Sequence, residues 1–247
     1  MTISPTGFTA YGASHCGVLA LFFIITISMI LIAHRCPSGK TARNMAWLLA
    51  ALLILTILSL LTYGVVYEPQ KAVDLLPMHL CDWLAFTAIA ALVWRKQLFY
   101  EITYFLGLAG TLQGLITPDL RYDYPHFYFF AFFLVHAGIL TTVFYMTFGL
   151  KMRPNPISLV RAFIFIQFYM ICAFLTNWLL GTNYGYLQSK PENPSLLDHL
   201  GPWPWYLLSM QGLAILLFLI YYAPWWWVDH RKAKKAIIPP SGTNEPC

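Results

Sequence analysis

The sequence predicts an all-α fold, a polytopic bundle of seven transmembrane helices. First, 59% of the 247 residues are hydrophobic. Second, only 10% of the residues are charged, well below the roughly 25% typical of soluble domains. Third, the apolar residues form runs long enough to cross the hydrocarbon core of a bilayer, which is about 30 Å thick. The length leaves room for one bundle, residues 1–230, and a basic, Pro-rich cytoplasmic tail, residues 231–247.

Seven apolar runs define the expected spans. Aromatic residues make up 17% of the chain, and many lie at the ends of these runs, where Trp and Tyr meet the membrane interfaces. The fourth run is marginal, because about 17 residues barely cross the hydrocarbon. The expected spans are Gly17–Ala33, Met45–Val66, Leu75–Trp94, Tyr100–Ile116, Phe127–Leu150, Leu159–Leu180 and Pro204–Val228.

The basic residues predict the orientation. With the N-terminus outside, only Lys71, Arg121 and Lys190 of the 15 Lys and Arg residues fall in outer segments. Cytoplasmic segments carry the excess of Lys and Arg in membrane proteins. The sequence therefore predicts an outside N-terminus, a cytoplasmic C-terminus and an odd number of spans.

The charge and cysteine patterns argue against nucleic-acid binding, a disulfide framework and a zinc site. The net charge of +5 does not indicate nucleic-acid binding, because the basic residues lie in loop-sized clusters that serve topology. The five cysteines show no CxxC spacing, so neither a disulfide framework nor a zinc site is indicated. We expect no cofactor and no metal, and the sequence points to no particular protein partner.

A polar cluster lies at the head of the third run, where residues 76–83 read LPMHLCDW. Polar groups are costly in hydrocarbon and by default indicate a functional site. His136, in the fifth span, is expected roughly 15 Å deep. Cys81 and His136 come from different helices and suit a nucleophile and its base. His79 and Asp82, three residues apart, form a neighbouring polar pair.

Other polar side chains are expected in the same outer half of the bundle. Gln113 and Asn177 lie there, which predicts a cavity that opens to the outer side. Either amide would suit an oxyanion as a hydrogen-bond donor. On the fourth span, Gly107, Gly110 and Gly114 share one face, a spacing that favours close helix packing.

Two other interpretations of the polar cluster stay open. One is a metal site, for which Cys and His are common ligands. The other is a structural role, because a membrane cysteine is often a small apolar core residue and buried His, Asn and Gln side chains often join helices. The metal alternative would use His79, Cys81, Asp82 and His136.

Several motifs resemble those of a known family. They are residues 76–82, 183–187, Lys190-Pro191 and 195–206, together with a histidine 55 residues after Cys81. The sequence resembles the bacterial YwaF-like integral membrane proteins and their animal relative, transmembrane protein 164. The animal member is similar to lipid acyltransferases that use a membrane cysteine and a histidine. The androgen-induced hydrolases, distantly similar in fold, cleave lipid esters with a threonine.

The resemblance implies a lipid acyltransferase or acyl hydrolase in the bacterial inner (cytoplasmic) membrane. Cys81 would attack the acyl group of a phospholipid or other acyl lipid, and His136 would act as its base. The segment 183–206 would be a lid or gate. A non-enzymatic carrier, receptor or small-molecule binder with the same cavity remains the alternative. The residues expected to bind substrate are His79, Asp82, Gln113, Asn177, Asn183 and Tyr184.

Overall fold

The computed structural model describes residues 7–35, 39–67, 73, 76–191 and 195–237. Lys71 and residues 238–247 of the predicted tail lie outside these ranges. Within them the chain is helical apart from connecting segments and one isolated bridge between Gly7 and Tyr122. The all-α prediction is therefore confirmed for this part of the chain. The main helices are α1 (Ala13–Arg35), α2 (Lys40–Tyr67), α3 (Leu80–Trp94), α4 (Gln97–Leu106), α5 (Leu112–Ile116), α6 (Phe127–Phe144), α7 (Pro156–Leu180) and α8 (Trp205–Ile237).

Within the described residues, five helical segments are long and apolar enough to cross a membrane. They are α1, α2, α7, α8 and α6 continued by the π-helix η3 (Tyr145–Gly149). Leu48 on α2 and Trp178 on α7 are each 73% exposed. Such broad outward apolar faces need lipid around them. The chain is therefore an integral membrane protein.

The third and fourth expected spans are not single long helices: the third is short and the fourth is divided by a π-helix. Helix α3 is apolar but has only 15 residues. Helices α4 and α5 are joined by the π-helix η2 (Gly107–Thr111), so helical structure continues from residue 97 to 116. A π-helical turn inside an α-helix is rare and is frequent at functional sites. Here it lies beside α3 and α6.

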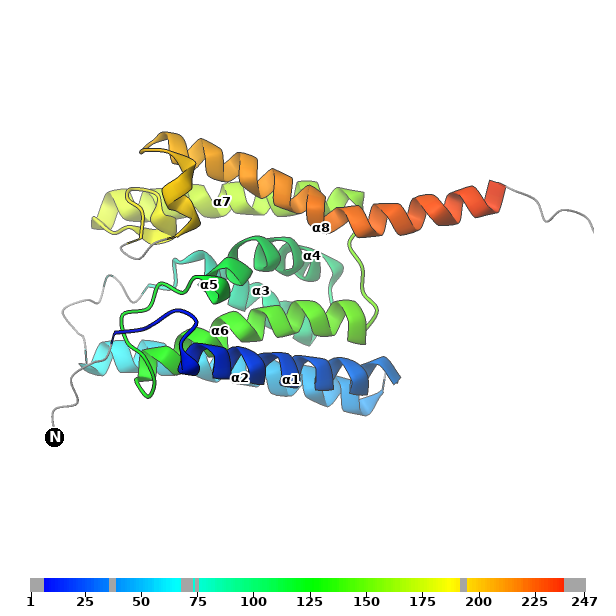
Figure 1. Cartoon of the computed structure of the whole chain (residues 1–247), viewed down its shortest axis with the longest axis horizontal. Helices are drawn as coiled ribbons and strands as arrows, with labels where there is room; N and C mark the ends of the chain where they lie inside the picture. The colour runs from blue at the N-terminus through cyan, green and yellow to red at the C-terminus, as the bar shows by residue number, and fades with distance from the viewer. Residues whose placement is uncertain (1–6, 36–38, 68–72, 74–75, 192–194, 238–247) are drawn as a thin grey trace, which may run out of the picture.

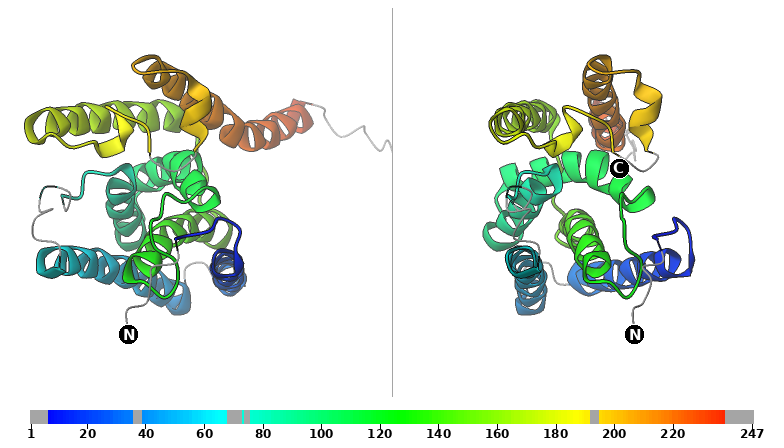
Figure 2. Two further views of the ribbon diagram at one scale, coloured as in Figure 1. Left: turned by 60° about the vertical axis from the view of Figure 1, so that its left-hand side comes forward. Right: turned by 90° about the vertical axis from the view of Figure 1, so that its left-hand side faces the viewer.

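The helices form three layers (Figure 1). α7 and α8 lie along one side, α3, α4 and α5 lie in the middle, and α1, α2 and α6 lie on the other side. The end-on view in Figure 2 separates the α7–α8 layer from the rest. α3 packs against α2, α4 and α6, so its side chains lie at the centre of the bundle.

Two expected helix boundaries were wrong. α3 begins at Leu80 and not at Leu75, because the Asp82 carboxylate accepts a hydrogen bond from the His79 backbone N–H at 3.0 Å. This is how an acidic residue at the third helical position caps a helix. α8 continues to Ile237 and not to Val228, so the first residues of the expected tail are helical.

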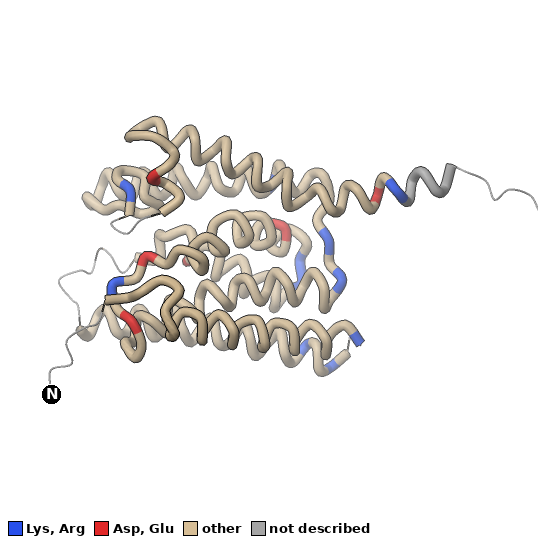
Figure 3. Tube along the Cα trace, viewed as in Figure 1, with Lys and Arg blue, Asp and Glu red and all other residues tan. Residues whose placement is uncertain are grey.

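Lysine and arginine gather at the end of the bundle where α1 ends and α2 begins (Figure 3). We call this the basic end. Side chains tie its segments together: His34 Nδ1 lies 3.0 Å from the Phe148 carbonyl oxygen, and the Tyr145 hydroxyl donates to the Ala42 carbonyl. The opposite end, which we call the loop end, contains residues 117–126, 181–191 and 195–204 and includes both acidic and basic residues.

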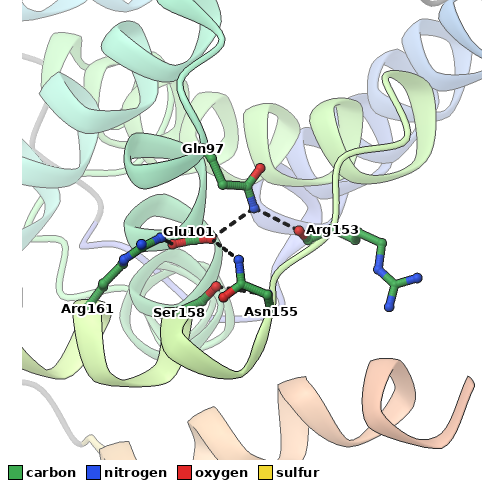
Figure 4. A network of polar contacts seen from close by, with 6 residues as sticks. All are labelled: Gln97, Glu101, Arg153, Asn155, Ser158 and Arg161. Atoms are coloured by element: carbon green, nitrogen blue, oxygen red, sulfur yellow. Dashed lines mark hydrogen bonds and ion pairs between the residues drawn. The ribbon is translucent and has the colours of Figure 1, made fainter. Parts of the chain in front are cut away.

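Glu101 of α4 is a buried carboxylate at the basic end, and the sequence interpretation missed it. It is 0% exposed and accepts hydrogen bonds from Gln97 at 2.9 Å, Asn155 at 3.0 Å and Arg161 at 2.9 Å (Figure 4). A buried carboxylate needs such partners, because an unpaired charge there would be very costly. The network joins α4 to the start of α7.

The segment between α7 and α8 packs back onto the bundle. The Trp203 indole N–H donates to the Leu187 carbonyl at 3.2 Å, and the Tyr206 hydroxyl donates to the Tyr186 carbonyl. Tyr184 is buried against Tyr169 of α7. This segment therefore covers the loop end of α3 and α7. We call its described residues, 181–191 and 195–204, the covering segment.

Candidate functional site

Cys81 and His136 line the same cavity, which has a volume of about 440 Å³. Cys81 comes from α3 and His136 from α6, two helices that pack directly against each other. We call this space the Cys81 cavity. It lies toward the loop end, because the connection after α5 forms part of its wall. Its other lining residues are Leu60, Asp82, Asp119, Leu120, Arg121, Tyr122, Tyr128, Ala131, Phe132 and Val135.

Cys81 is the second residue of α3 and is a free, half-buried thiol. The N-terminal end of a helix favours negative charge. A thiol becomes an effective nucleophile when a neighbouring base takes its proton.

The hydrogen bonding of His136 assigns its tautomer. Its Nδ1 lies 2.9 Å from the Phe132 carbonyl oxygen, and the Phe132 ring stacks on the imidazole with centroids 4.0 Å apart. A carbonyl oxygen only accepts, so Nδ1 carries the hydrogen and Nε2 has the free lone pair. His136 is 9% exposed, and in this tautomer its Nε2 is able to accept a proton.

Gly114 of α5 makes room for the His136 ring. A Cβ atom added at Gly114 would lie 2.8 Å from His136 Cδ2 and 3.0 Å from Nε2. Close packing on the glycine face was predicted, and at Gly114 the group that packs closely is the His136 imidazole. Only a residue without a side chain leaves space for this ring.

Gly114→Ala is expected to displace the His136 ring and to lower any His136-dependent thiol reactivity by up to about 100-fold, because a misplacement of about 1 Å can cost that much. Rates of thiol alkylation of the purified protein would measure this. Gly110→Ala is the matched control, because its added Cβ would meet only Leu80 Cδ2 at 3.4 Å. Equal rates in the two variants would contradict the prediction.

His79 and Asp82 lie together as a capping box at the start of α3, in which the side chain of each bonds to the backbone of the other. Asp82 caps α3 through the His79 backbone N–H and also lines the Cys81 cavity. The His79 ring packs edge-on against Tyr184, with centroids 4.9 Å apart. His79 thus links the start of α3 to the covering segment, and it is not among the described residues that line the cavity.

Asn177 holds the covering segment in place. It is 0% exposed, its Nδ2 donates to the Tyr184 carbonyl at 3.0 Å, and its Oδ1 accepts from the Thr182 hydroxyl at 2.9 Å and the Tyr184 N–H at 2.7 Å. The Tyr184 hydroxyl donates to the Val73 carbonyl. These bonds give Asn177 and Tyr184 structural roles, and both the oxygen and the nitrogen of the Asn177 amide bond to residues 182–184.

Asn177→Leu is expected to lower the free energy of unfolding by about 2 kcal/mol, because it leaves buried backbone groups without partners. Thermal unfolding in detergent would measure the loss, and limited proteolysis would show earlier cleavage within 182–204. Thr176→Val is the control, because its hydroxyl bonds only to the Cys172 carbonyl of its own helix. Wild-type stability in Asn177→Leu would contradict this role.

Asn183 and Gln113 lie away from the Cys81 cavity lining. Asn183 Nδ2 donates to the Ser189 carbonyl at 2.9 Å and hydroxyl at 2.7 Å, and its Oδ1 accepts from the N–H groups of Gln188 and Ser189. It therefore shapes the loop. Gln113 precedes Gly114 on α5 and is not among the described residues that line either of the two cavities at the loop end.

The structure adds Asp119 and Arg121 to the site, neither of which the sequence interpretation assigned, and Tyr128 of α6, a polar residue of the same outer half, also lines the cavity. The Tyr186 hydroxyl donates to Asp119 at 2.8 Å. Burial, and then the negative charge of Asp119, raises the pKa of Tyr186, so this phenol stays protonated at neutral pH and remains a donor. The polar loop that follows the short helix α5 was the available signal for Asp119 and Arg121.

The metal alternative gains no support. Among the described residues, no three His, Cys, Asp or Glu side chains lie together in a way that would hold a metal ion.

The fold and the site define a class of protein: a helical membrane protein in which a cysteine, a histidine and apolar side chains line one cavity. The family model described as the TMEM164 family matches residues 10–222. The chain therefore belongs to the TMEM164 family, and the expected relation to transmembrane protein 164 is confirmed.

The matched region includes both Cys81 and His136. The chain is also similar to a protein of Treponema pallidum (strain Nichols) described as uncharacterized. The two are 24% identical over 237 residues, which cover 96% of this chain and 98% of that protein. No solved structure matches the chain.

Proposed function

We propose that this protein is a lipid acyltransferase or acyl hydrolase in which Cys81 is the nucleophile and His136 the base. The observation that carries the proposal is that Cys81 and His136, from two different helices, line one cavity. The cavity also presents Leu60, Ala131 and Val135, which suit an acyl chain. The tautomer of His136 supports the role of a base.

The reaction would run in two steps. His136 Nε2 takes the proton of the Cys81 thiol while the sulfur bonds to the acyl carbonyl carbon, and the ester C–O bond breaks. The leaving alkoxide takes the proton from His136, which leaves an acyl-cysteine thioester. In the second step, water or a lipid hydroxyl gives its proton to His136 and bonds to the carbonyl carbon. The C–S bond then breaks and the thiolate recovers the proton.

The proposal also includes the membrane topology, with seven crossings and an outside N-terminus. α3 and the continuous segment α4–η2–α5 would add two crossings to the five long helices and make seven. The distribution of Lys and Arg supports a cytoplasmic basic end, with the N-terminus and the loop end outside. The substrate would then enter from the outer leaflet, in the inner membrane of a YwaF-like bacterial protein.

A lipid electrophile tests the proposal directly. An acyl chain ending in an iodoacetamide group should alkylate Cys81 in the purified full-length protein, and intact-mass and peptide analysis would locate the label. His136→Ala should slow the labelling by about 100-fold, because a general base typically contributes 10²–10⁴-fold. Phe148→Ala, a half-exposed aromatic at the basic end, is the control.

Labelling that is equally fast in wild type and His136→Ala would overturn the base assignment. Labelling confined to other cysteines would overturn the nucleophile as well, and would favour a non-enzymatic carrier, receptor or binder that uses the same cavity.

A further inference from the structure

A second cavity adjoins the first at the loop end. Its volume is about 480 Å³, and it shares Asp119, Leu120 and Arg121 with the Cys81 cavity. We call it the Lys190 cavity. Because the segment 119–121 belongs to both walls, the two spaces lie next to each other along it. The remaining lining residues are Gly7, Phe8, Asn183, Tyr186, Ser189, Lys190 and Pro191.

The two cavities differ in chemical character. The Cys81 cavity is lined mainly by aliphatic and aromatic side chains, together with Cys81, Asp82, His136 and the shared Asp119 and Arg121. The Lys190 cavity presents mainly polar groups: two cations, one carboxylate, an amide and two hydroxyls. The carboxylate is Asp119, to which Tyr186 donates a hydrogen bond. Arg121 and Lys190 therefore leave the cavity with an excess of positive charge.

The loop that carries Lys190 is held in position. Asn183 makes four hydrogen bonds to Gln188 and Ser189. Lys190 Nζ lies 3.5 Å from the Asp198 carbonyl oxygen and 5.6 Å from the centre of the Tyr206 ring. A cation held by one long hydrogen bond and an aromatic face keeps donor capacity for an anion, since an ammonium carries three N–H groups.

We propose that the Lys190 cavity binds the phosphate group of a glycerophospholipid whose ester lies at Cys81. Arg and Lys are the side chains that bind phosphate best, Arg through paired N–H groups and Lys as a point charge. In a glycerophospholipid the phosphate and the acyl esters are joined through one glycerol unit. A basic polar cavity that adjoins an apolar one containing the thiol matches that order of groups.

This inference rests on the proposed function for the position of the ester, and binding is therefore measured without chemistry. The full-length Cys81→Ala protein in detergent would be titrated with dioctanoyl phosphatidylglycerol, dioctanoylglycerol and inorganic phosphate. We expect the phospholipid to bind at least about tenfold more tightly than the phosphate-free lipid, since hydrogen bonds to charged groups are the strong ones. Inorganic phosphate should bind much more weakly than the phospholipid.

Variants locate the phosphate site. Arg121→Gln with Lys190→Gln should remove most of the preference for the phospholipid, whereas Arg121→Lys, which keeps the charge, should retain part of it. Arg43→Gln, an exposed cation on α2 at the basic end, should change nothing. Thermal unfolding of each variant would verify folding, and the affinity for dioctanoylglycerol should stay constant.

Equal binding of the two lipids, or an unchanged preference in the double Gln variant, would overturn the inference. So would inorganic phosphate binding as tightly as the phospholipid, which would indicate a free-anion site. If the preference depends on Arg121 and Lys190 but Cys81 never reacts with the lipid electrophile, the proposed chemistry fails while the phosphate site stands.

Discussion

Cys81→Ser is expected to lower acyl turnover at least about 100-fold, because a serine hydroxyl at this position is a much weaker nucleophile than a thiol. The change alters one atom, so folding should be preserved. Turnover would be measured as the release or exchange of a labelled acyl chain from a phospholipid by the full-length protein in nanodiscs. No acyl adduct should then form at residue 81.

Two comparisons make this experiment specific. Cys16→Ser and Cys172→Ser are the matched controls, because both are free thiols in the described part of the chain outside the cavity lining, and both should keep wild-type turnover. Cys81→Ser combined with His136→Ala should be no slower than Cys81→Ser alone, since residues that act as a unit are strongly non-additive. Full activity of Cys81→Ser would exclude the thioester mechanism.

Glu101→Leu is expected to lower the free energy of unfolding by about 3 kcal/mol, because it leaves the donors of Gln97, Asn155 and Arg161 without their acceptor. Part of the loss is offset, since the Arg161 side chain is 42% exposed and is able to reach water. Chemical or thermal unfolding in detergent, followed by tryptophan fluorescence, would give the value. Glu101→Gln keeps an acceptor and should lose less.

The control for Glu101 is the ion pair between Arg153 and Asp229, which lies at the same end of the bundle. Its side chains are 40% and 48% exposed, and exposed pairs are worth about 0–1 kcal/mol. Asp229→Asn should therefore have little effect on unfolding. A Glu101→Leu protein as stable as Asp229→Asn would show that the buried network does not hold α4 to α7.

Much of the architecture follows from the sequence because hydropathy is a strong signal. The long apolar runs of α1, α2, α6, α7 and α8 are found close to where they were expected. The helix ends were less predictable: α3 starts five residues late because Asp82 caps it, and α8 continues past the expected end. A cap depends on one local hydrogen bond that an apolar window does not contain.

The candidate site was predictable in part. Cys81 and His136 stand out because polar side chains are scarce at their depth, and the structure places both on one cavity wall. Asn177 looked equally suited to bind a ligand, but all its described hydrogen bonds go to the covering segment. Glu101 was overlooked, although a carboxylate within an apolar run is itself a signal of a buried partner.

By itself the sequence determined that this is an α-helical membrane protein of the TMEM164 family, with a cysteine and a histidine among its few polar membrane residues. Only the tertiary structure decided which polar groups meet, that Gly114 makes room for the His136 ring, and that the segment 119–121 lines two neighbouring cavities. The physical reason is that an apolar run shows where a helix lies in the bilayer, whereas packing against its neighbours sets the rotation about its axis.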